Sequence, residues 1–113
     1  FLSGSDNFVF ESFVLGARGC LLGLAGIAGR MTASLLSLVR SGKIDQAAKL
    51  NEEKYSPLAE AMFAPAMRDN RARIKEGLKH LGVIPNATVR APLQPLSEED
   101  KARMIDAVKR VFA

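Results

Sequence analysis

The stretch FLSGSDNFVFESFVLGARGCLLGLAGIAGR, residues 1–30, decides the fold of this protein. Its first residues, FLS, have the character of the end of a buried strand, which GSDN then interrupts. Apolar residues at helical spacing follow at 8–14, and Gly16 ends this short helix. The run ARGCLLGLAG, residues 17–26, is apolar and bounded by glycine, which is typical of a strand covered on both faces, with Leu21–Gly26 as its main part. Strand, helix and strand in this order predict a parallel pair of strands.

The turn after the first strand carries small and polar residues that commonly begin a helix. Gly4 is expected to permit an unusual backbone conformation. Ser5 or Asp6 is expected to cap the following helix by accepting hydrogen bonds from its free amide groups.

The rest of the chain is predicted to be helical. Residues 30–42 carry an apolar stripe that ends at Gly42. Residues 43–64 form a longer helical pattern, but Pro57 lies inside it and should kink or split the helix, because proline lacks a backbone donor.

Two further helices are expected at the end of the chain, at 70–82 and 97–113, joined by a connector rich in proline. The last helix begins with a capping signal, in which Ser97 precedes three acidic residues, and basic residues stand near its end. The buried stripe of this helix is predicted to consist of Met104, Ile105, Val108, Val111 and Phe112.

Composition and charge argue against nucleic-acid and membrane partners. The 113 residues are 48% hydrophobic and 25% charged, with a formal net charge of only +4. The densest basic stretch, residues 68–80, contains interleaved acids and no aromatic residues for base stacking, so a solvated helix face is expected there. The most apolar stretch has about eleven residues, where a spanning helix needs roughly twenty.

The single cysteine, Cys20, lies in an apolar run and cannot form an internal disulfide. A small buried apolar residue in a reducing cytoplasm is the favoured interpretation. No spacing of histidine and cysteine suggests a metal site, and no cofactor is expected.

The apolar residues at the start of the chain, 1–30, predict that the chain is incomplete by itself. Two short parallel strands do not make a stable sheet, because a buried strand needs neighbours on both sides. We therefore expect residues 1–30 to be covered by structure that these 113 residues do not encode, as at the end of a larger α/β domain.

Several motifs along the whole chain resemble the C-terminal portion of the dihydrodipicolinate synthase and N-acetylneuraminate lyase superfamily. They occur in the same order as in that superfamily. The turn Gly4, Ser5 and Asp6 is similar to the family's Gly-x-Asp turn, and LGARGCLLG to its Leu-Gly-Ala-x-Gly-x-Ile-Ser segment. The later motifs are SGKIDQAAKLNEEKYSPLAEAMF, NRARIKEGLKHLG and VRAPLQPLSEED.

This resemblance implies an α/β fold, with the last two βα units of a TIM (β/α)8 barrel at residues 1–42 and a C-terminal helical extension at 43–113. It also implies a tetrameric lyase or aldolase that holds pyruvate as a Schiff base on a lysine, and that condenses or cleaves it with an aldehyde. The family's lysine, proton-shuttling tyrosine and carboxylate-binding loop would all precede Phe1. The lysines of this chain and Tyr55 are not expected to be catalytic.

The resemblance further implies that this chain supplies the rim of the pocket at the carboxyl ends of the strands. The candidate substrate-binding residues are Gly4, Asp6, Asn7, Leu21 and Gly23, with Leu21 acting through its backbone carbonyl. Asp6 could instead be a helix cap, and the glycines could serve close packing.

The chain departs from the family pattern at several of these positions. Gly23 replaces a frequent serine and Gly26 a frequent asparagine, which implies a roomier or more apolar end of the pocket. Arg71 and Arg73 replace prolines, which should make the start of that helix more regular and more exposed.

Alternative functions remain open on the sequence alone. The parent could be an N-acetylneuraminate or 2-keto-3-deoxy sugar acid lyase. The segment could also be a non-catalytic helical module that pairs with a partner chain.

Overall fold

The computed structural model describes residues 1–112. These residues form two compact units that divide between Ala59 and Glu60, and each is described by itself. The sequence predicts a division elsewhere, into barrel units at 1–42 and a helical extension at 43–113. That division refers to a complete barrel, and it stays a prediction.

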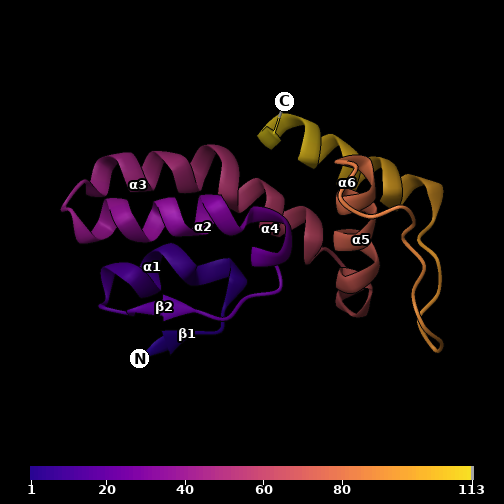
Figure 1. The fold of residues 1–113 in the computed structure, drawn as a ribbon, viewed down its shortest axis with the longest axis horizontal. Helices are drawn as coiled ribbons and strands as arrows, with labels where there is room; N and C mark the ends of the chain where they lie inside the picture. The colour runs from indigo at the N-terminus through magenta and orange to yellow at the C-terminus, as the bar shows by residue number, and fades with distance from the viewer. Residues whose placement is uncertain (113) are drawn as a thin grey trace. The chain divides into compact units, whose positions relative to one another are not determined.

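The first unit contains a two-stranded parallel sheet, as the sequence predicts. Strand β1, Leu2–Ser3, pairs with β2, Gly19–Cys20, so that Leu2 lies opposite Gly19. Between the strands, a 3-10 turn at Asp6–Phe8 leads into helix α1, Val9–Val14 (Figure 1). This helix buries Val9 and Phe13, whereas Phe10 is half-buried and Val14 is exposed. Phe8, at the end of the 3-10 turn, is exposed too.

The prediction of a strand through Leu21–Gly26 is wrong. Strand β2 ends at Cys20, and helix α2, Ala25–Arg40, begins within the stretch that was expected to be strand. Leu24 and Ala28, four residues apart, are both buried, which is the spacing of one helix face. A short apolar run bounded by glycine does not distinguish a buried strand from a buried helix end, and here the helix prevails.

Pro57 interrupts the next helical segment, as predicted. Helix α3, Ile44–Leu50, is followed by a π-helical turn, Asn51–Tyr55, and then by α4, Ser56–Met62. The wider π turn ends two residues before Pro57, in the segment where an ordinary helix would have a ring clash and a missing donor. Helix α3 packs against α2 in the first unit (Figure 1).

Glycine in the left-handed region follows α1 and α2, as predicted. Gly16 has φ of 101° and Gly42 has φ of 77°, conformations that residues with a side chain rarely adopt. Gly4 has no such conformation, so the expectation of an unusual backbone at that position is wrong.

The second unit is built on two helices that pack against each other, α5, Asn70–His80, and α6, Glu98–Phe112. A 3-10 turn, Met67–Asp69, precedes α5, and an irregular connector joins the two helices (Figure 1). The cap of α6 is confirmed, because the backbone amide of Asp100 donates to Ser97 Oγ at 3.1 Å. The apolar residues buried in this unit include Met62, Ala72, Leu96, Met104, Val108 and Val111.

The expectation that the start of α5 is exposed is wrong at Arg73, which is buried. Arg71 is exposed, but Arg73 is only 1% exposed. Its guanidinium pairs with Asp100, at 3.0 Å between Nη2 and Oδ2, and donates to the backbone carbonyls of Met62, Ala64 and Pro65. Burial is possible because these acceptors occupy every N–H of the side chain.

Candidate functional site at the strand carboxyl edge

The predicted site residues meet at one edge of the small sheet. Because β1 and β2 are parallel and in register, Gly4 and Leu21 each follow the last residue of a strand at the same end. The amide of Leu21 donates to the carbonyl of Ser3 at 2.9 Å, which extends the pairing to this edge. We call the turns Gly4–Asn7 and Leu21–Leu24 the carboxyl edge.

Asp6 joins the two turns of the carboxyl edge. Its Oδ1 accepts the backbone N–H of Leu24 at 2.7 Å. Neither Ser5 nor Asp6 caps the helix that directly follows it, so that prediction is wrong. Leu24 is the residue before α2, and the Asp6 carboxylate therefore lies at the amino end of that helix, where a negative charge is favourable.

Hydrogen bonds from two serine hydroxyl groups support the first turn of the carboxyl edge, residues 4–7. Ser3, which is buried, donates to Ser12 Oγ at 2.9 Å, and Ser12 donates to the carbonyl of Phe8 at 2.8 Å. The amide of Ser5 donates to Ser3 Oγ at 3.3 Å. These bonds hold the backbone of the turn to α1.

The carboxyl edge offers polar backbone and a carboxylate to solvent. Gly4, Asn7, Leu21 and Gly23 are exposed, and Asp6 is half-buried. Such groups can bind and orient a polar ligand. They include no nucleophile beside a base, so the edge by itself has the chemistry of a binding surface.

Cys20 lies at the end of β2, beside this edge. Burial raises the pKa of its thiol, and the negative charge of Asp6 raises it further. A thiol with a raised pKa stays protonated near neutral pH and is a weak nucleophile.

Tyr55, which was not expected to be catalytic, is a buried polar residue of the first unit. It comes from the π-helical turn, is 1% exposed, and its hydroxyl has no hydrogen-bond partner within residues 1–112. Burial raises its pKa; the nearby Thr32 hydroxyl opposes that rise, and the charges of Asp6 and Cys20 add to it.

None of the lysines within residues 1–112 is buried, whereas a Schiff-base lysine is often activated by desolvation in an apolar pocket. The pKa of Lys101 is raised by its hydrogen bond to Glu98. Lys75 donates to the carbonyl of Thr88 at 2.6 Å, and the lysines at 43, 49, 54, 79 and 109 are exposed.

Within residues 1–112 there is no cluster of side chains suited to holding a metal ion. Over the same residues, no helix has the length and apolar character needed to cross a membrane.

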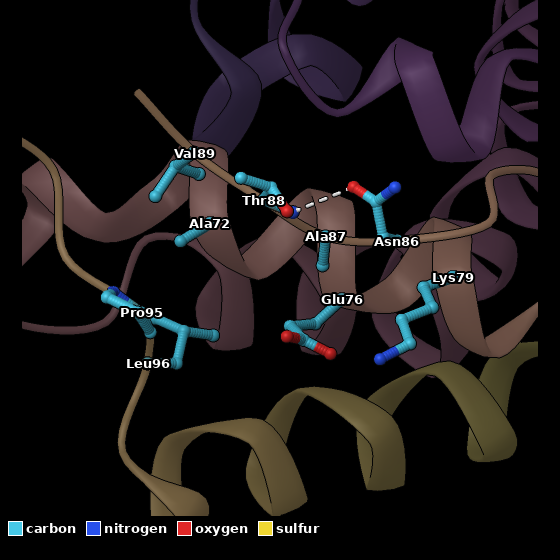
Figure 2. Close-up of a pocket in the computed structure, with 9 residues that line it drawn as sticks. All are labelled: Ala72, Glu76, Lys79, Asn86, Ala87, Thr88, Val89, Pro95 and Leu96. Carbon is cyan, nitrogen blue, oxygen red and sulfur yellow. Dashed lines mark hydrogen bonds between the residues drawn. The ribbon is translucent and has the colours of Figure 1, made fainter. Parts of the chain in front are cut away.

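A separate cavity of about 270 Å³ lies in the second unit (Figure 2). Glu76 and Lys79 of α5 line one side, and the connector lines the other. Asn86 accepts the amide of Thr88 at 3.3 Å and so shapes that wall. None of the predicted site residues borders this cavity.

Comparison with known proteins assigns the family. Residues 1–111 match the model of the dihydrodipicolinate synthetase family. The chain belongs to this family. The 4-hydroxy-tetrahydrodipicolinate synthase of Methanothrix thermoacetophila is 30% identical over 110 residues, which are 97% of this chain and 36% of that protein. The enzyme of the same name from Thermomicrobium roseum is 33% identical over 107 residues, 95% of this chain and 34% of that protein.

Solved structures agree with this assignment. A dihydrodipicolinate synthase from Acinetobacter baumannii, in complex with pyruvate, is 27% identical with a TM-score of 0.81, covering 96% of this chain and 36% of that one. The N-acetylneuraminate lyase of Fusobacterium nucleatum is 24% identical with a TM-score of 0.84, covering 99% and 37%, and shares the fold. The chain thus spans about a third of the length of the relatives that it matches.

Proposed function

We propose that this chain is the C-terminal part of a pyruvate-dependent Schiff-base lyase or aldolase that resembles 4-hydroxy-tetrahydrodipicolinate synthase. The observation that carries the proposal is the family match over residues 1–111, together with relatives of that name at 30% and 33% identity. In this proposal, residues 1–42 are the last two βα units of a TIM barrel, and residues 43–113 are its helical extension.

The chain's part in the reaction would be to bind and orient substrate at the carboxyl edge. Active sites of such barrels lie at the carboxyl ends of the strands. Gly4, Asp6, Asn7, Leu21 and Gly23 would form part of the pocket rim. The bond from Leu24 to Asp6 supports this role, because it keeps the two turns in one fixed geometry.

The rest of the barrel would cover the apolar surface of the first unit. Phe1 and Leu2 are 70% and 69% exposed, and Leu21 is 84% exposed. Large apolar side chains that stay this exposed commonly mark an interface. A homotetramer in the cytoplasm, acting on pyruvate and an aldehyde without a cofactor, completes the proposal.

The test is reductive trapping of the full-length protein with pyruvate and borohydride. We expect a covalent adduct, and peptide mapping should place it outside residues 1–113, because Lys75 and Lys101 are engaged as described and the remaining lysines are exposed. Borohydride without pyruvate is the control. No mass increase would refute the Schiff-base chemistry, and an adduct on a lysine of this chain would refute the assigned role.

A second candidate is a lyase of N-acetylneuraminate or of a 2-keto-3-deoxy sugar acid. The resemblance matches Gly4, Asp6 and Asn7 to positions that contact the substrate tail in sialic-acid lyases. It also implies a roomier end of the pocket, because Gly23 and Gly26 replace larger residues of the family. Both candidates should form the adduct, so the aldehyde that supports turnover separates them. A non-catalytic helical module should form none.

A further inference from the structure

A continuous chain of hydrogen bonds runs from the first turn of the carboxyl edge to helix α1. The amide of Ser5 donates to Ser3 Oγ at 3.3 Å, and the Ser3 hydroxyl donates to Ser12 Oγ at 2.9 Å. The Ser12 hydroxyl donates in turn to the carbonyl of Phe8 at 2.8 Å. The direction of every bond is fixed, because an amide N–H can only donate and a carbonyl oxygen can only accept.

Ser12 has a role in this chain that its position in a helix does not explain. A serine that donates to the carbonyl four residues earlier is common in helices and indicates nothing more by itself. The Ser12 oxygen also accepts the hydroxyl of Ser3, however, and Ser3 is only 6% exposed. Buried polar groups rarely stay without a partner, so the Ser3 hydroxyl would have to turn away if this acceptor were lost.

The two residues next to this chain of bonds hold the carboxyl edge together. The carbonyl of Ser3 accepts the amide of Leu21 at 2.9 Å, and Asp6 Oδ1 accepts the amide of Leu24 at 2.7 Å. Ser5 directly precedes Asp6 in the chain. The bond that fixes the Ser5 amide therefore restricts where the Asp6 carboxylate can point.

We propose that Ser12 is a positioning residue for the carboxyl edge. It lies on α1, outside both turns of the edge, and it acts through the hydroxyl of Ser3. With that hydroxyl held, the Ser5 amide keeps its acceptor and the Asp6 carboxylate stays aligned with the amide of Leu24.

The consequence for catalysis rests on the proposed function. If the carboxyl edge contacts the second substrate, then a looser edge weakens binding of that substrate. The chemistry on pyruvate, which the proposed function assigns to residues outside this chain, stays intact. Ser12 thus influences the affinity for the second substrate without touching it.

The first test is hydrogen exchange of single amides in the full-length protein, which needs no activity. In Ser12→Ala we expect the amides of Ser5 and Leu24 to exchange about tenfold faster, because each donates one of the bonds described. Amides of the second unit at residues 70–80 should keep their rates. Ser12→Thr retains a hydroxyl and should keep both rates within about twofold of those in the unmodified protein.

Ser34→Ala is the matched control, because Ser34 makes the same type of bond within α2, to the carbonyl of Arg30 at 3.0 Å. Its loss should leave the Ser5 amide unchanged. An unchanged rate at Leu24 in Ser12→Ala would overturn the proposal. Equal loss of protection throughout the protein would overturn it as well, since it would show that Ser12 serves only general stability.

The second test is kinetic and uses the aldehyde that supports turnover. In Ser12→Ala we expect KM for this aldehyde to rise about three- to tenfold with kcat changed less than about twofold, and the pyruvate adduct to form normally. Loss of kcat together with an unchanged KM would refute the positioning role. Absence of the adduct in the unmodified protein would refute the proposed function instead, and the exchange result would still decide the role of Ser12.

Discussion

At the scale of single residues, Arg73 has the most demanding environment in the second unit. Its side chain joins the end of α4, the turn after it and the first turn of α6 through Asp100. Its partners are the Asp100 carboxylate and three backbone carbonyls, of which that of Met62 belongs to a buried residue. An arginine can satisfy them together because its five donors lie in one plane.

We expect Arg73→Ala to destabilise the protein by about 3–5 kcal/mol, because it strands Asp100 and several carbonyl groups. Chemical unfolding measures the change. Arg71→Ala, on the same helix but exposed, should alter the stability by less than about 0.5 kcal/mol. Similar losses in both variants would contradict a special role for the buried guanidinium.

The Cys20 thiol yields a prediction about pH. Its folded pKa is raised above 9.0, so the folded state keeps a proton that the unfolded state loses. This contribution to stability is present below the pKa of the unfolded thiol and is lost as pH rises through the folded pKa.

Alkylation of Cys20 should therefore be slow near pH 7 and accelerate at strongly alkaline pH, relative to the same thiol in the denatured protein. Mass spectrometry follows the reaction. A rate at neutral pH equal to that of the denatured protein would show that the pKa of the half-buried thiol is not raised.

At the scale of elements, helix ends decide much of the architecture. Helix α1 ends at a left-handed glycine, α2 begins beside Asp6, and α6 begins at Ser97. The ends of helices carry unpaired backbone groups, so one well-placed polar side chain can set where a helix starts.

Ser97→Ala should reduce stability by about 0.5–2 kcal/mol, since the amide of Asp100 loses its acceptor. Thermal unfolding is a suitable measurement. Ser97→Asp retains an acceptor and should restore most of the stability. Equal melting temperatures for Ser97→Ala and the unmodified protein would exclude a capping role.

At the scale of the whole molecule, the first unit exposes an apolar surface that its own helices leave uncovered. Phe8 and Leu15 are 62% and 78% exposed, in addition to the first two residues and Leu21. Burying such surface is the main driving force of association, so we expect another protein surface to cover it.

Residues 1–113 expressed alone should bind a hydrophobic dye and self-associate, whereas the full-length protein should do neither through this surface. Dye fluorescence and sedimentation give the readouts. Replacing Leu21 with serine should weaken dye binding by the isolated segment. A monodisperse segment that melts cooperatively without binding dye would favour the independent helical module.

The sequence by itself determined the parallel strand pair, the interruption at Pro57, the cap at Ser97 and the family. Each depends on local chemistry: glycine and proline restrict nearby backbone angles, and a serine oxygen reaches an amide three residues away. The family follows from several motifs that occur along the chain in the same order as in its other members.

Only the tertiary structure decided that α2 begins inside the apolar run, that Asp6 bonds to Leu24, and that Arg73 is buried against Asp100. The last two contacts join residues 18 and 27 positions apart. Their partners are chosen by how the helices pack, because spacing along the chain carries no signal for a hydrogen bond between distant segments. The burial of Tyr55 arises in the same way, because the π-helical turn that carries it packs against α2.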